Sequence, residues 1–158
     1  MLHTDITVRP PHASDICRLL RGLRQADRAE IAAAGCDPRT IIEQSVHDSP
    51  FCWAALADGE LILLFGVAPM RGQPGTGIPW AMGTDLVQTH RRTLMRRVPA
   101  YIALMLRAYP RLVNFVHAEN DRSIHWLRHM GFTLEPAAPH GPHLAMFRRF
   151  EMRANGPD

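Results

Sequence analysis

The chain has 158 residues, of which 46% are hydrophobic, and a formal net charge of +3 at pH 7. This length suits one domain with a two- or three-layer core, spanning 1–158. No apolar run reaches the length of a membrane span, and the N-terminus lacks the basic-then-apolar pattern of a signal peptide. All eighteen basic residues are arginine. The composition therefore argues against a membrane protein and excludes chemistry that needs a lysine amine.

The three cysteines, Cys17, Cys36 and Cys52, are an odd number and have no metal-binding spacing. Each lies among apolar or helical neighbours. We therefore expect buried free thiols in a reducing compartment.

The first fifty residues are predicted to form a short strand at 6–10 and three helices. Ser14 is predicted to cap the first helix, whose apolar residues recur at i, i+3, i+4 and i+7. The pattern at 27–30 is typical of a capping box for a second helix that stops at Gly35, and Asp37 is predicted to cap a third. Arginines on the outer faces of these helices are predicted to be solvated.

A β-hairpin is predicted next, from strand-like segments at 51–57 and 60–67. The Asp58-Gly59 dipeptide between them is a strong signal for a two-residue turn. The second strand is apolar throughout, so it should be buried on both faces. Half of the residues at 68–79 are Gly or Pro, which predicts a mobile surface loop.

A βαβ unit is predicted from strands at 79–87 and 112–117 with a long helix at 90–109 between them. The two strands should be parallel, because a helical crossover connects them. Pro99 is predicted to kink or restart the helix.

The last predicted helix covers 120–130, with a cap at Asn120 or Asp121 and a stop at Gly131. Two strands follow, at 132–135 and 143–152, with a rigid Pro/His-rich turn at 136–142 between them. The tail from Arg153 is predicted to be disordered.

The motif Asn-x-x-Ser-Ile-x-x-Leu-x-x-x-Gly-Phe, from Asn120 to Phe132, resembles the last conserved block of the GNAT acyltransferases, which bind acetyl-CoA. The sequence at 65–69, 79–86 and 126–132 resembles that of a divergent branch of tailed-phage internal virion or core proteins with a GNAT-like fold. The resemblance covers nearly the whole chain and implies an α/β fold, with a mixed central sheet flanked by helices.

The resemblance implies acetyl-CoA as the cofactor, bound where a helix begins after the fourth strand. Free amides and the positive end of that helix would face the pyrophosphate. The family's signature there begins with a residue matched by Gln88, but Arg91 and Thr93 occupy its two small positions. Two interpretations stay open: Arg91 and Arg92 bind the phosphates directly, or the cofactor site is degraded.

Gly83 and the adjacent Thr84 match the place where the family has a strand bulge that turns an amide toward the thioester carbonyl. The alternative is a glycine packed beneath Trp80. Asn120 matches the family's asparagine near the pantetheine arm, and helix capping explains the same residue without any ligand.

The family's proton-donating tyrosine is replaced by Leu127, which cannot transfer a proton. His125 and His129 lie nearby and can transfer protons near neutral pH. They could also form an i, i+4 metal pair, but no third ligand is identifiable, and two exposed histidines are the favoured interpretation. Asp85 and His117 are candidate bases, because each ends a strand at the edge of the expected cleft.

Two functions are compatible with these residues. The first is a phage or prophage GNAT-like protein that acetylates an amine, with CoA and an amine as partners. The alternative is a non-catalytic virion or assembly protein that retains the fold and contacts virion proteins or itself. The arginine cluster at 91–97 has no interleaved aromatic residues, so nucleic acid is the least favoured partner. The expected location is the bacterial cytoplasm, or the virion.

Overall fold

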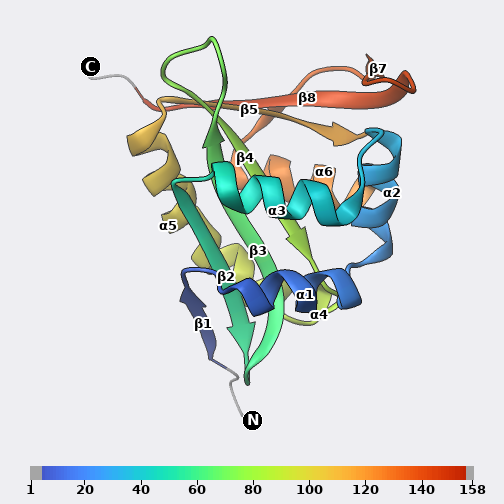
Figure 1. The fold of residues 1–158 in the computed structure, drawn as a ribbon. Coiled ribbons are helices and arrows are strands. Elements are labelled where there is room, and N and C mark those ends of the chain that lie inside the picture. The colour runs from blue at the N-terminus through green and yellow to red at the C-terminus, as the bar shows by residue number, and fades with distance from the viewer. Residues whose placement is uncertain (1–4, 156–158) are drawn as a thin grey trace.

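The computed structural model describes residues 5–155, which form one α/β domain around a mixed eight-stranded sheet (Figure 1). The strand order is β1-β2-β3-β4-β5-β8-β6, and β7 pairs with β8. The neighbouring strands are antiparallel except for β4 and β5, which are parallel, as the βαβ pattern predicted. The strands are β1 (Ile6–Arg9), β2 (Phe51–Ala57), β3 (Glu60–Pro69), β4 (Thr76–Gly83), β5 (Arg111–His117), β6 (Thr133–Leu134), β7 (Ala138–His140) and β8 (Ala145–Arg153).

Helices cover both faces of the sheet (Figure 1). On one face Leu19, Ile42 and Leu64 belong to one buried cluster, and on the other Ile62 and Ile102 belong to a second. In residues 5–155, none of the helices is both long and apolar enough to cross a membrane. The first face carries α1 (Ala13–Gly22), α2 (Gln25–Ala33) and α3 (Pro38–Asp48), the second carries α5 (Arg91–Ala108) and α6 (Asp121–Met130), and the short α4 (Leu86–Thr89) follows β4.

The parallel strands β4 and β5 pair only where they begin. Backbone pairing joins Thr76 to Arg111 and Gly77 to Leu112, and the ladder stops there. Further along, the Asn114 side chain reaches across, and its Nδ2 donates to the carbonyl of Pro79 at 2.7 Å. The two strands therefore separate toward their carboxyl ends, which opens the sheet between α2 and α6.

The start of α1 differs from the prediction. The helix begins after His12, and Ser14 lies inside its first turn. The buried Asp15 carboxylate accepts the His12 backbone N–H at 2.7 Å and pairs with Arg9 at 2.7 Å. Asp15 therefore takes the capping role that was predicted for Ser14. It also connects α1 to β1 through Arg9.

The start of α2 also differs. The helix begins directly after Arg24, whose guanidinium donates to Asp27 at 2.7 Å, so the capping box predicted at 27–30 is wrong. Arg28, predicted to be solvated, donates to the carbonyl of Leu20 at 2.8 Å and covers the end of α1. Arg24 and Arg28 both bind partners around the turn between α1 and α2. The local sequence pattern does not reveal these contacts.

The strand predicted at 79–87 is shifted toward the N-terminus. Pairing of β3 with β4 extends to Pro69 and Gly77, so both ends of the loop predicted at 68–79 lie in strands. The strand ends at Gly83, and Leu86 begins α4. The glycines and prolines do not interrupt β4, because the neighbouring β3 provides a strand with which this segment pairs.

Three further predictions are corrected. Helix α5 continues through Pro99, so the helix does not restart there. The short β7 forms inside the turn predicted at 136–142. Arg153 belongs to β8 and the Ala154 N–H donates to Pro110 at 2.7 Å, so the tail is ordered there; its last residues, 156–158, lie outside the described part.

The cysteines are less buried than predicted. Cys17 and Cys36 are exposed, because they lie on the outer side of α1 and just after α2. Cys52 is half-buried in β2, and burial raises the pKa of its thiol to about 12.

An arginine cluster around Glu151 makes the stability of the fold depend on pH. Hydrogen bonds from Arg111 and Arg153, and from Arg149 to a smaller extent, lower the pKa of Glu151 from 4.5 to about 2. A carboxyl whose pKa is lowered in the folded state stabilises the fold above its ordinary pKa, and loses this effect as the pH falls through the folded value.

We expect Glu151→Gln to lower the melting temperature at pH 7. In thermal melts from pH 7 to pH 2, its difference from the wild type should shrink below about pH 4.5; a constant difference would contradict this.

Candidate functional site

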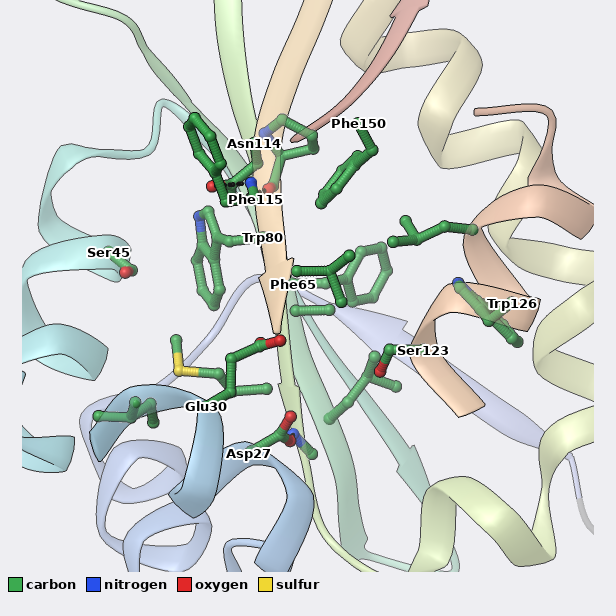
Figure 2. A pocket seen from close by; sticks show the side chains of 18 of the residues that line it. Asp27, Glu30, Ser45, Phe65, Trp80, Asn114, Phe115, Ser123, Trp126 and Phe150 are labelled. Atoms are coloured by element: carbon green, nitrogen blue, oxygen red, sulfur yellow. Dashed lines mark hydrogen bonds between the residues drawn. The ribbon is translucent and has the colours of Figure 1, made fainter. Parts of the chain in front are cut away.

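A cavity of about 830 Å³ lies where β4 and β5 separate. It extends to both faces of the sheet, as Figure 2 shows: Trp80 and Ser45 lie on the α3 side, and Ser123 and Trp126 lie on the α6 side. Its lining includes, among others, residues of α2 and α3 (Asp27, Glu30, Ile31, Ile41, Ser45, Asp48), of β4 and β5 (Trp80, Met82, Gly83, Asn114, Phe115, Val116) and of α5 and α6 (Arg91, Leu94, Val98, Ser123, His125, Trp126, Leu127).

Two carboxylates of α2 connect the separated strand ends. The buried Asp27 carboxylate accepts the Gly83 backbone N–H of β4 at 2.8 Å. Glu30, one helical turn later, accepts the backbone N–H of His117 at the end of β5 at 2.7 Å. Because residues three apart lie on one helix face, the two acids together close the end of the gap (Figure 2).

Glu30 has the chemical character of a proton acceptor. Burial raises the pKa of its carboxyl above 4.5, and the charge of Asp27 adds to the rise, whereas the N–H donated by His117 opposes it. Asp27 is paired with Arg24, but within residues 5–155 no ion pair is found for Glu30. A cavity-lining carboxyl with a raised pKa is suited to take a proton from a ligand near neutral pH.

The bulge predicted at Gly83 is absent. The register between β3 and β4 is regular up to the Leu63–Gly83 pair. The irregularity in this part of the sheet lies in the β2–β3 ladder, where Ile62 of β3 is skipped between the Ala55–Leu63 and Leu56–Leu61 pairs. The Gly83 amide is already donated to Asp27, so it is not free for a thioester carbonyl. A glycine is needed here for a different reason, because a Cβ at this position would lie 2.5 Å from the side chain of Val87. The glycine therefore packs against Val87 and not, as the alternative interpretation predicted, beneath Trp80.

The cavity brings together only some of the sequence-predicted site residues. Gly83, Gln88, Arg91 and His125 line it, together with Leu127 at the position of the missing tyrosine. The others are absent from its lining and lie around it: Thr84, whose hydroxyl donates to Leu61 at 2.9 Å; Asp85, exposed before α4; Arg92, on the outer side of α5; His117, whose ring packs edge-on against Phe147; and Asn120, whose side chain caps α6.

Sequence reasoning missed the residues that line the acidic and aromatic part of the cavity. Asp27 and Glu30 were assigned to a local helix cap, although their spacing of three is also what two acids on one helix face require. From the sequence, Trp80 is named only as a ring that could pack over Gly83, and Phe115 is not singled out. Neither residue has a local signature, because they meet only when β4 and β5 are placed side by side.

The first turn of α5 lies at the α6 side of the cavity, where Arg91 lines the opening. The first amides of a helix have no partner inside it, and the helix dipole favours anions there. Leu94 and Val98 continue the same wall with apolar side chains. This side therefore suits a ligand with an anionic end and a long, weakly polar arm.

Comparison with solved structures gives the fold. The chain is similar to Ard1 from Thermoplasma volcanium (TM-score 0.73, 14% identity, covering 96% of this chain and 99% of that one). It is also similar to the ribosomal-protein-S18-alanine N-acetyltransferase from Escherichia coli (TM-score 0.67, 10% identity, 98% and 97%). A third similar structure is spermidine N-acetyltransferase from Vibrio cholerae in complex with CoA and spermine (TM-score 0.66, 16% identity, 94% and 95%). This chain has the GNAT fold. Neither protein-family descriptions nor curated protein sequences match it.

Proposed function

We propose that this protein transfers an acetyl group from acetyl-CoA to an amine. The observation that carries the proposal is the cavity between β4 and β5, which has an anion-attracting helix end on one side and the carboxyl of Glu30 on the other. The residues present fit acetyl-CoA, because α5 offers Arg91 and free amides to phosphates while apolar side chains line the path inward. The similarity to N-acetyltransferase structures supports the same reaction.

In this reaction the acceptor nitrogen forms a bond to the acetyl carbon while the carbon–sulphur bond breaks. Bound acetyl-CoA would supply the activated acetyl thioester. Glu30 takes the proton that the acceptor amine must lose. His125, which lines the α6 side, replaces the absent tyrosine and gives a proton to the leaving sulphur. The backbone donor that Gly83 was predicted to supply is not part of this proposal, because its amide is held by Asp27.

The proposed cofactor site is tested by two adjacent arginines. CoA should raise the melting temperature of the wild type, because a ligand that binds only the folded state stabilises it by mass action. Arg91→Ala should remove most of this rise, since Arg91 lines the cavity, and the rise in the wild type should shrink at high salt. Arg92→Ala is the matched control, because Arg92 is exposed like Arg91 but is absent from the cavity lining. Equal losses in both variants would contradict a specific phosphate site, and a flat melting curve with millimolar CoA would contradict CoA binding altogether.

A second candidate is a non-catalytic virion or assembly protein of phage type that kept the fold. It is favoured by Leu127, which lines the cavity where the family has its tyrosine, and by Arg91 and Thr93 in the two small positions. It predicts that the purified protein shows neither CoA binding nor acetyl transfer, and that it is found among the proteins of purified phage particles. Mass spectrometry of such particles distinguishes the two candidates.

A further inference from the structure

Aromatic rings gather on the side of the cavity that faces α2 and α3. Trp80 of β4 and Phe115 of β5 line this side and lie near one another (Figure 2). The ring of His140 stacks on Phe115, with the centroids 3.8 Å apart and the planes 12° from parallel. Phe147 meets His140 at a steep angle with a centroid distance of 5.6 Å. This side of the cavity therefore has flat apolar walls, which suit a planar ligand group.

The walls are held in place without a ligand. The indole N–H of Trp80 donates to the hydroxyl of Ser49 at 2.8 Å, and that buried hydroxyl donates in turn to the carbonyl of Ser45 at the end of α3. Phe115 is fixed by its stack with His140. A preformed site spends little free energy on ordering its side chains when a ligand binds.

Two turns meet at this side of the cavity. Gly35, between α2 and α3, lies so near the turn between β7 and β8 that a Cβ on it would be 2.4 Å from Pro142. Gly141 of the same turn lies over Ala34, because a Cβ on Gly141 would be 3.8 Å from the carbonyl oxygen of Ala34. The two turns are therefore in contact beside Ala34, Cys36 and His140, which line the cavity.

The charges on this side favour one positive group. Asp27 is paired with Arg24, whereas Glu30 has no such partner in the described chain. Asp48 also lines the cavity, but it is exposed at the rim. A single inward carboxylate matches a single ammonium group and leaves the further charges of a polyamine without partners.

We propose that the acceptor is a small primary amine with one aromatic ring, which binds with its ring against Trp80 and Phe115 and its ammonium group at Glu30. The inference rests on the proposed function, since it names the acceptor class of the same reaction. The aromatic walls recognise the ring, and Glu30 recognises the charge.

The test is isothermal titration calorimetry of the full chain with 2-phenylethylamine, with and without CoA. Butylamine lacks the ring and 2-phenylethanol lacks the ammonium, so each removes one of the two recognised groups. Each should bind at least about tenfold more weakly than 2-phenylethylamine. Spermidine and a short peptide with an N-terminal alanine should also bind more weakly.

Two variants locate the ring. Phe115→Leu keeps an apolar side chain and removes the ring, so it should weaken 2-phenylethylamine binding by about 3- to 10-fold and leave butylamine binding unchanged. His140→Ala removes the stacked ring at an exposed position, and it keeps the test decisive if Phe115→Leu folds poorly. Phe51→Leu, at an exposed aromatic of β2 that is absent from the cavity lining, is the matched control.

Equal binding of butylamine and 2-phenylethylamine would overturn the acceptor class whether or not CoA binds. Tighter binding of spermidine or of the peptide would overturn it as well. A retained preference for the aromatic amine in a protein that does not bind CoA would instead contradict the proposed function and leave the ligand class of the pocket standing.

Discussion

Replacing Glu30 by glutamine should lower kcat for acetyl transfer by about 10²- to 10⁴-fold, the usual contribution of a general base. Glutamine has nearly the same shape, and its side-chain oxygen can still accept the His117 N–H that Glu30 accepts at 2.7 Å. The variant should therefore fold, and CoA should still raise its melting temperature. The measurement is steady-state kinetics with acetyl-CoA and 2-phenylethylamine. Glu43→Gln, an exposed carboxylate of α3 outside the cavity lining, is the control.

The pH profile gives an independent readout of the same role. A base must be deprotonated to act, so kcat/KM should fall as the pH drops through the pKa of Glu30. Because burial raises that pKa, the fall should begin above the ordinary carboxyl range of about 4.3. The acidic limb should vanish in Glu30→Gln. An unchanged limb in this variant, or a kcat within about twofold of wild type where a base should give at least 10²-fold, would remove Glu30 from the mechanism.

Asp27→Ala should destabilise the fold by about 3 kcal/mol, at the low end for a broken buried ion pair because the Arg24 side chain is 23% exposed. The change leaves the guanidinium of Arg24 and the buried N–H of Gly83 without their acceptor. Urea unfolding monitored by circular dichroism measures the loss in free energy of unfolding.

Asp37→Ala is the matched control for this prediction. It removes an exposed cap of α3, which accepts the Thr40 N–H at 3.0 Å, and should lower the stability clearly less than Asp27→Ala does. An Asp27→Ala variant no less stable than Asp37→Ala would show that the connection between α2 and β4 contributes little.

Much of the fold could be predicted because its elements carry local signals. The Asp58-Gly59 turn is confirmed, with φ of 49° and 76° joining the antiparallel β2 and β3. Asn120 caps α6 and Gly131 ends it with φ of 103°, as the motif predicted. Each signal depends on a few adjacent residues whose backbone preference is decisive.

The site was harder to predict because its contacts are distant in sequence. Glu30 and His117 are 87 residues apart, and Asp27 and Gly83 are 56 apart. No local pattern indicates that β4 and β5 separate after Gly77, and that separation decides which side chains face the cavity. Family resemblance led to Gly83 as a backbone donor, but it could not reveal that an acid of α2 already holds its amide.

The most direct test of acetyl transfer is mass spectrometry of a single-turnover reaction. Acetyl-CoA is the limiting reagent in this reaction, and both the protein and 2-phenylethylamine are in excess over it. The proposed function predicts one N-acetylated amine and one free CoA thiol for each acetyl-CoA consumed, at a rate that falls strongly in Glu30→Gln. If CoA raises the melting temperature but no acetylated product forms from 2-phenylethylamine, butylamine, spermidine or the alanine peptide, the protein binds the cofactor without catalysis, and the central claim is contradicted.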